Sequence, residues 1–279
     1  MKTYFKIAAY LFLLFLISIY ILVPTSKVNY NVKQGYKWER YDSKLALNLK
    51  SIDDILNYTD QISGPAGRQS LTYLQNLQYV LAMRFYHGYS YYSLHQNWIA
   101  FLAGKLVWSD LDAIVSSKDI LLHPYAACSQ VSIVFSDCLK KMGVPFRKVM
   151  LKGHFVLEAS IDNKWYLLDA NLEPSFSHGI KSIAELKASN ELMEAYKGHK
   201  TDEELKVIFS RIDYGPVNSS IAPVTFAFQK TTMFLSALIA VFLLIYVTYD
   251  LCIHLLKNQD RIKEHKLYQF IRYQFIKVS

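Results

Sequence analysis

A cysteine, a histidine and an aspartate occupy positions in the middle of the chain where they could act together. Cys128 follows Pro124 by four residues and opens a segment with a helical pattern. A thiol becomes a useful nucleophile only as the thiolate, and a helix N-terminus together with a nearby imidazole favours that form. The imidazole has to come from another element, and a third group has to fix its tautomer. We expect His154 and Asp169 to fill these two roles.

His154 and Asp169 fall on two expected β-strands that a tight turn connects. The segments HFVLEASI and KWYLLDAN flank an Asp-Asn pair at residues 162–163, which is typical of a β-hairpin. In a two-residue hairpin, Asp169 falls opposite residues 156–157, within two or three positions of His154. The sequence therefore predicts that imidazole and carboxylate lie near one end of the same face of the sheet.

The order of these elements resembles that of a known family. The family pattern is a cysteine that opens a helix, a G-[IV]-P-x-R turn, a G-H-x-W-x-E strand and a W-x-x-x-D strand. This chain has ACSQVSIVFSDCLKKMGVPFRKVML and then GHFVLEASIDNKWYLLDAN. It resembles the transglutaminase-like superfamily, a branch of the papain-like cysteine enzymes. The resemblance covers about residues 110–174, and the helices before that segment fit the family's bundle only loosely.

The resemblance implies that Cys128 is the nucleophile, His154 the base and Asp169 the residue that orients the base. It also implies acyl transfer from an amide bond of a peptide or protein through a thioester. Water as the acceptor gives a peptidase or amidase, an amine gives a transglutaminase, and no side chain distinguishes the two. The N–H of Cys128 is the one oxyanion donor that the sequence identifies. Ala127 replaces a frequent Gly and Val156 a frequent Trp, and neither change removes a catalytic group.

Other interpretations of the same residues stay open. A chain that keeps the fold without the chemistry would be a scaffold or assembly protein of the cell envelope, and it would tolerate loss of Cys128. A zinc site is disfavoured, because the His-x4-Cys spacing from His123 matches no familiar ligand pair. We therefore expect no metal and no cofactor. Cys138 is interpreted as a packing residue in mid-helix, and Glu158 and Glu173 are expected at solvated positions.

Two apolar runs explain much of the composition, which is 52% hydrophobic and only 19% charged. Residues 7–23 and residues 231–249 carry no charge over 17 and 19 positions, enough to cross a hydrocarbon core of about 30 Å. No small-residue cleavage motif follows the first run, which favours an anchor over a signal peptide. The second run is apolar on every face, which favours a membrane span over a buried core helix.

The distribution of basic residues predicts the orientation in the membrane. Residues 257–279 hold six basic and two acidic side chains, and Lys2 and Lys6 precede the first run. Residues 27–225 hold 22 basic and 20 acidic side chains. We therefore expect two spans in the plasma (inner) membrane, both termini in the cytoplasm, and the domain on the periplasmic or extracellular side. The nearly neutral middle disfavours nucleic-acid binding, which needs a basic face.

The predicted fold is α+β, with a papain-like or transglutaminase-like core of a helical bundle and an antiparallel sheet between two transmembrane helices. Helical patterns cover residues 69–85, 96–107, 129–142, 182–196 and 202–212. The expected divisions are an anchor at residues 1–26, a stalk at 27–50, the domain at 51–225 with its core at 110–174, a transmembrane helix at 226–256 and a basic tail at 257–279. The tail fits an interfacial helix on anionic lipid or a solvated segment equally well.

Overall fold

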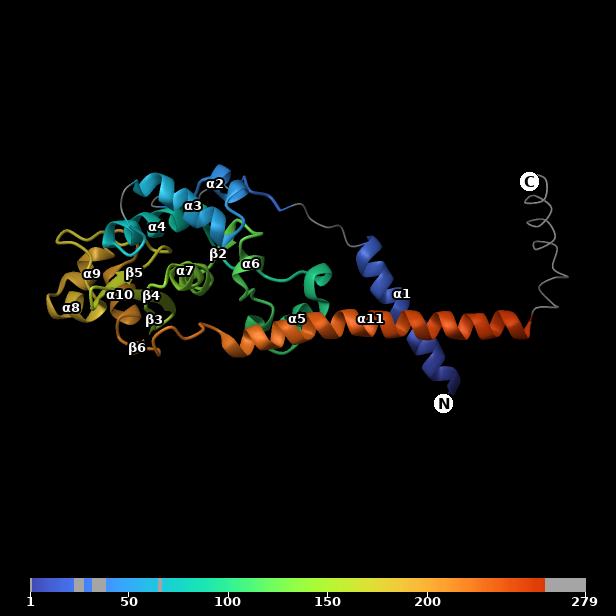
Figure 1. Cartoon of the computed structure of the whole chain (residues 1–279). Coiled ribbons are helices and arrows are strands. Elements are labelled where there is room, and N and C mark those ends of the chain that lie inside the picture. The colour runs from blue at the N-terminus through green and yellow to red at the C-terminus, as the bar shows by residue number, and fades with distance from the viewer. Residues whose placement is uncertain (1, 23–27, 32–38, 65–66, 259–279) are drawn as a thin grey trace. The chain divides into compact units, whose positions relative to one another are not determined.

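The structure, a computed structural model, describes residues 2–22, 28–31, 39–64 and 67–258 (Figure 1). The chain divides into two compact units. The larger unit, called the domain below, consists of Ser26–Ser93 and Ala100–Gln229, and the smaller one of Met1–Thr25, Leu94–Ile99 and Lys230–Ser279. The three predicted catalytic residues all belong to the domain. Nearly all of the predicted basic tail lies outside the described residues.

Eleven α-helices and one short 3-10 helix occur in the described part of the chain. The α-helices are α1 (Lys2–Leu22), α2 (Ser43–Asn48), α3 (Ile52–Ser63), α4 (Leu71–Arg84), α5 (Leu94–Leu106), α6 (Ser117–Ile120), α7 (Cys128–Met142), α8 (Ile183–Ala188), α9 (Glu191–Ala195), α10 (Asp202–Ile208) and α11 (Pro223–Lys257), and the 3-10 helix is η1 (Ser109–Leu111).

Four strands form an antiparallel sheet in the order β5-β4-β3-β6. Their bounds are β3 (Phe146–Leu151), β4 (His154–Ile161), β5 (Lys164–Leu168) and β6 (Ile212–Tyr214). Two further strands, β1 (Tyr86–His87) and β2 (Tyr125–Ala126), pair with each other in parallel. The helices and the antiparallel sheet confirm the predicted α+β class.

The β4–β5 hairpin has the predicted two-residue turn. Asp162 and Asn163 have φ angles of 50° and 61°, and positive φ at both central residues is what a type I′ turn requires. The register of the hairpin, continued one position beyond β5, places Asp169 opposite Val156. This is the predicted register, and side-chain alternation then puts Asp169 on the same face as His154, two positions away.

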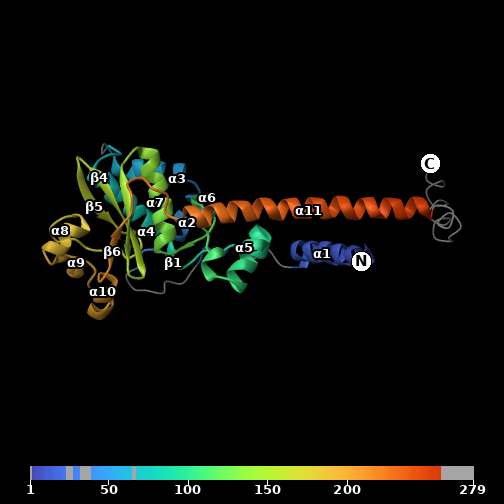
Figure 2. The same ribbon diagram turned by 90° about the horizontal axis from the view of Figure 1, so that it is seen from below.

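One apolar core lies on each face of the sheet. On one face, Leu157 of β4 packs in a cluster that includes Phe135 of α7. On the other face, Leu167 of β5 packs with Ile183 of α8 and with Tyr196, which follows α9. Figure 2 shows α7 on one side of the sheet and α8, α9 and α10 together on the other. Each fully buried large apolar side chain contributes about 1.5–3 kcal/mol, so both layers hold the sheet in place.

Three segments differ from their sequence patterns. The expected stalk contains α2, and Leu45 of this helix and Leu49, which follows it, are buried in the domain core. The pattern over residues 182–196 forms two helices, because Asn190 adopts a left-handed conformation with φ 59°. The helix expected over residues 202–212 ends at Ile208, and Ile212 begins β6 instead. A short apolar run does not distinguish a strand from a helix. Here the pairing with β3 makes residues 212–214 a strand.

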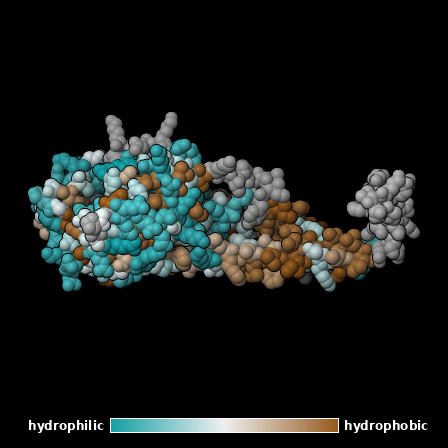
Figure 3. Space-filling model, turned by 45° about the horizontal axis from the view of Figure 1, so that its top comes forward, coloured by the Kyte–Doolittle hydropathy of each residue, from teal (hydrophilic) through white to brown (hydrophobic). Residues whose placement is uncertain are grey.

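One described helix, α11, is long and apolar enough to cross a bilayer, and only 6% of its most apolar window is buried. Figure 3 shows hydrophobic colouring along this helix. Helix α1 has a shorter apolar stretch, Tyr4–Ser18, and Val23 of the first predicted span lies outside the described residues. By its length and composition, α11 could therefore be a membrane span.

Candidate active site

His154 and Asp169 form a buried pair. His154 is the first residue of β4, and Asp169 follows the last residue of β5. The ring nitrogen Nε2 of His154 lies 2.7 Å from Oδ2 of Asp169. The two residues are only 8% and 2% exposed, so solvent does not screen their interaction. The hairpin register thus brings together the two side chains that the sequence predicts to meet.

Further hydrogen bonds fix the carboxylate of Asp169. Its Oδ1 accepts the backbone N–H groups of Asn171 and Leu172, both at 3.0 Å. Its Oδ2 also accepts the hydroxyl of Tyr196 at 3.0 Å. Burial by itself raises the pKa of Asp169, but His154 and the two N–H groups outweigh it and hold the pKa below its usual value. Asp169 is therefore an anion, and both of its carboxylate oxygens have hydrogen-bond partners.

Cys128 is the first residue of α7 and is partly exposed. Because the first N–H groups of a helix have no acceptor within the helix, the thiol lies where backbone donors and the helix dipole favour negative charge. Gln130 holds this end of the helix: its Oε1 accepts the N–H of Ala127 at 3.2 Å and that of Ser90 at 2.9 Å. Its Nε2 donates to the carbonyls of Ser90 and Ile114, both at 2.8 Å.

The thiol of Cys128 lies near the imidazole of His154 and is one of the groups that raise the pKa of that ring. Because Nε2 of the ring is engaged by Asp169, Nδ1 is the nitrogen left for the sulfur. Burial lowers the pKa of His154, whereas Asp169 and Cys128 outweigh it and hold the pKa well above its usual value. The structure therefore brings all three predicted residues together, with an imidazole that holds its proton at neutral pH.

Tyr89 lies beside Cys128. The parallel pairing of β1 with β2 matches His87 with Ala126. The segments that follow these two strands lead to Tyr89 and to Cys128. Burial raises the pKa of Tyr89, and the charge of Cys128 raises it further. The ring of Tyr89 lies 5.6 Å from that of Tyr91, centroid to centroid, and both are about half exposed. The two rings form an exposed aromatic pair, of which Tyr89 lies near the thiol.

Glu173 lies close to the triad and is largely buried, contrary to the solvated position expected for it. Its backbone N–H donates to the carbonyl of Asp169 at 3.2 Å, and its carboxylate lies 3.1 Å from Nε of Arg40. Burial raises the pKa of Glu173 to about 7; Arg40 opposes this shift, and Asp169 and Glu39 add to it. This carboxyl therefore exchanges its proton near neutral pH.

Glu158 is also not solvated, and its role is structural. It is fully buried and lies 2.6 Å from Arg147, its direct partner across the β3–β4 pair. The guanidinium of Arg147 lies 4.3 Å from the ring centres of both Trp165 and Tyr214. Arg147 is the arginine of the G-V-P-F-R turn, so this part of the motif braces the sheet that carries His154.

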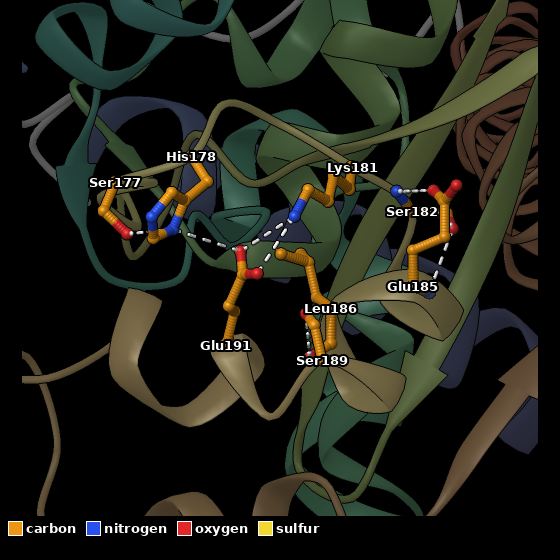
Figure 4. A network of polar contacts seen from close by, with 8 residues as sticks. All are labelled: Ser177, His178, Lys181, Ser182, Glu185, Leu186, Ser189 and Glu191. Carbon is orange, nitrogen blue, oxygen red and sulfur yellow. Dashed lines mark hydrogen bonds and ion pairs between the residues drawn. The ribbon is translucent and has the colours of Figure 1, made fainter.

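A surface hollow of about 490 Å³ is lined by Phe176, Leu186 and Glu191 among others, and no thiol or imidazole lines it. Lys181 donates to both carboxylate oxygens of Glu191, at 3.0 and 3.1 Å, as Figure 4 shows. This pair ties the loop before α8 to α9, which leads directly into Tyr196. We therefore interpret the hollow as part of the support of Tyr196 rather than as a reaction site.

Two supports of the site were not predicted from the sequence. Tyr196 gave no local signal, because only the packing of the layer after β5 brings its hydroxyl to Asp169. Gln130 could have been found, since a Gln three residues after the N-cap fits the capping-box pattern. Cys138 is fully buried in the core, where burial raises the pKa of its thiol. In the described part of the chain, no three or more His, Cys, Asp or Glu side chains are grouped to hold a metal ion.

Comparison of the chain with protein-family models, with curated proteins and with solved structures finds no match.

Proposed function

We propose that this chain is a membrane-anchored thiol enzyme that transfers the acyl group of an amide substrate, a peptide or protein, through a thioester. One observation carries the proposal. A partly exposed thiol at the first residue of a helix lies near an imidazole whose pKa it helps to raise, and a buried carboxylate 2.7 Å from the ring holds that imidazole. This is the nucleophile, base and orienting group that thiol catalysis requires.

In the proposed reaction the sulfur of Cys128 attacks the carbonyl carbon and forms a tetrahedral intermediate. Its oxyanion accepts the N–H of Cys128 at the helix N-terminus. The imidazolium of His154 then gives its proton to the leaving amine, the C–N bond breaks, and a thioester remains. His154, now neutral, takes a proton from the incoming acceptor as that acceptor attacks the thioester, and the C–S bond then breaks to release the product and restore the thiolate of Cys128. Asp169 stays ionised throughout and stabilises the charged ring.

Water as the acceptor releases a carboxylic acid, and an amine forms a new amide. We favour hydrolysis, because envelope members of such families need not be cross-linkers. In the proposed topology α1 and α11 both span the plasma membrane, and the domain acts on substrates at the outer face. The apolar surface of α11 and the basic residues next to both predicted spans support this arrangement.

The test is alkylation of the full chain in detergent with iodoacetamide between pH 5 and 9, with mass spectrometry of each cysteine. We expect Cys128 to react at pH 6–7, and we expect His154→Ala to slow it about tenfold or more, because the imidazolium stabilises the thiolate. Cys138 is an internal control, since its burial should block the reagent in both proteins.

The alternative to an enzyme is a scaffold that keeps the fold without the chemistry. That alternative predicts that Cys128 reacts no faster in the native chain than in His154→Ala, with a steep rise only at alkaline pH. It also predicts that Cys128→Ser has no effect in the cell that produces the protein. Such a result would leave a two-span envelope protein and remove the acyl-transfer proposal.

A further inference from the structure

The most exposed large apolar side chains of the domain lie at the end of α5 and at the start of α11. In the described part of the domain, those that are at least 60% exposed are Leu106 and Val107 at 80%, Trp108 at 60% and Val224 at 81%. Its other large apolar side chains are at most 52% exposed. Single exposed apolar residues are ordinary, but a run of three large ones indicates a surface with a partner. We call residues 106–108 the apolar turn.

The apolar turn has a fixed backbone. The N–H groups of Val107 and Trp108 both donate to the carbonyl of Ala103, at 2.9 and 3.1 Å, at the end of α5. The carbonyl of Trp108 accepts the N–H of Leu111 at 3.0 Å. A salt bridge of 2.9 Å between Lys105 and the buried Asp112 closes the turn. The three apolar side chains are therefore held outward by an ordered turn.

Gln229 of α11 binds the segment that follows the apolar turn. Its Nε2 donates to the carbonyls of Ala113 and Leu111, at 2.6 and 3.2 Å, and its Oε1 accepts the N–H of Val115 at 3.2 Å. Gln229 is only 2% exposed. It precedes the charge-free run that starts at Thr231 by two residues, or about 3 Å along a helix. The segment that follows the apolar turn is thus bound to the last residue of α11 that belongs to the domain.

We propose that Leu106, Val107 and Trp108, together with Val224, contact the lipid bilayer at the boundary between headgroups and acyl chains. The inference rests on the membrane-span part of the proposed function and is independent of the triad. Lipid is the occupant that continues the apolar surface of α11. Trp is the side chain enriched at this depth, and apolar residues of peripheral segments are buried about 5–10 Å there. The contact would hold the domain at the membrane surface by a second point besides the span.

The experiment places a fluorescent NBD label at position 107 through Val107→Cys, in a chain that also carries Cys128→Ser and Cys252→Ser. The full chain is reconstituted in phosphatidylcholine vesicles, with and without lipids that carry a spin label near the headgroup or deep in the acyl chain. Two matched variants carry the label at Val207→Cys, an exposed valine of α10, or at Leu244→Cys, an exposed residue of α11.

We expect the shallow spin label to quench the probe at position 107 about twofold or more relative to position 207, because the turn lies at headgroup depth. The deep spin label should quench position 244. If position 107 behaves like position 207 while position 244 is quenched, the lipid contact is wrong and the span stands. If position 244 is not quenched, the span fails and the lipid contact fails with it. Shielding of position 107 from aqueous iodide without quenching by lipid would indicate a protein partner and overturn the assignment.

Discussion

Tyr196 shows how a residue outside the triad can set its geometry. Its buried hydroxyl and Nε2 of His154 share Oδ2 of Asp169, so Tyr196 fixes the direction from which the carboxylate meets the ring. Tyr196→Phe removes a hydrogen bond to a charged acceptor and should cost roughly 1.5–3 kcal/mol of unfolding free energy. We also expect alkylation of Cys128 to slow several-fold, with its pH profile shifted, because the imidazole is held less firmly.

Tyr73→Phe is the matched control for that prediction. Tyr73 is equally buried and donates its hydroxyl to Asp60 at 2.7 Å, on α3. It should lose a comparable amount of stability and leave the alkylation profile of Cys128 unchanged. If the two variants change that profile alike, Tyr196 is a packing residue and does not position the triad.

Glu173 should make the stability of the domain depend on pH near neutrality. Its folded pKa of about 7 lies above the unfolded value of 4.5, so its contribution is fully present below pH 4.5 and is lost as the pH rises through 7. We expect Glu173→Gln to gain stability relative to the native chain between pH 5 and 8, by roughly 1–3 kcal/mol at pH 8. Thermal unfolding in detergent at several pH values measures this, and a pH-independent difference would contradict it.

At the scale of elements, the N-terminus of α7 depends on Gln130, a fully buried amide with four hydrogen bonds. Gln130→Ala leaves buried N–H and C=O groups of three segments without partners, at about 1–3 kcal/mol for each such group. We expect a loss of several kcal/mol of unfolding free energy in urea and slower alkylation of Cys128.

Gln69→Ala is the control at the other end of α7, where Gln69 makes one hydrogen bond of 3.3 Å to the carbonyl of Met142. This variant should lose about 1 kcal/mol or less. Similar losses in the two variants would contradict this role of Gln130.

The sequence predicted the elements that carry the triad because their signals are local. The Asp162-Asn163 turn fixes one hairpin register, and Gly143, with φ 70°, ends α7 as a left-handed glycine should. The parts that sequence analysis missed depend on contacts far apart in the chain. The pairing of β1 with β2, the strand β6 and the reach of Tyr196 to Asp169 join segments 27 to 65 residues apart. No pattern within any one of those segments encodes its partner.

At the scale of the whole molecule, the two apolar helices of the smaller unit meet in a way that bears on the proposed topology. Lys6, near the start of α1, forms an ion pair with Asp250, near the end of α11, and Tyr10 donates to the same carboxylate at 3.4 Å. The rings of Phe5 and Tyr246 lie 5.7 Å apart, edge to face. The start of one helix therefore lies beside the end of the other, as two spans with both termini on one side would require. A charge near a membrane is costly unless it is paired, which gives Lys6 and Asp250 a reason to meet.

This pairing predicts a specific cross-link. In a Cys252→Ser chain in membranes, Phe5→Cys with Tyr246→Cys should form a disulfide on oxidation. After proteolysis within the domain, the two end fragments should stay linked until a reductant is added. Leu14→Cys with Tyr246→Cys is the control, because Leu14 lies about 14 Å further along α1 and should not link. A reporter fused after Ser279 should be active only in the cytoplasm. Equal linking of both pairs would contradict this pairing of α1 with α11. A reporter active outside would overturn the proposed orientation, because two antiparallel spans put both ends of the chain on one side and that side is proposed to be the cytoplasm.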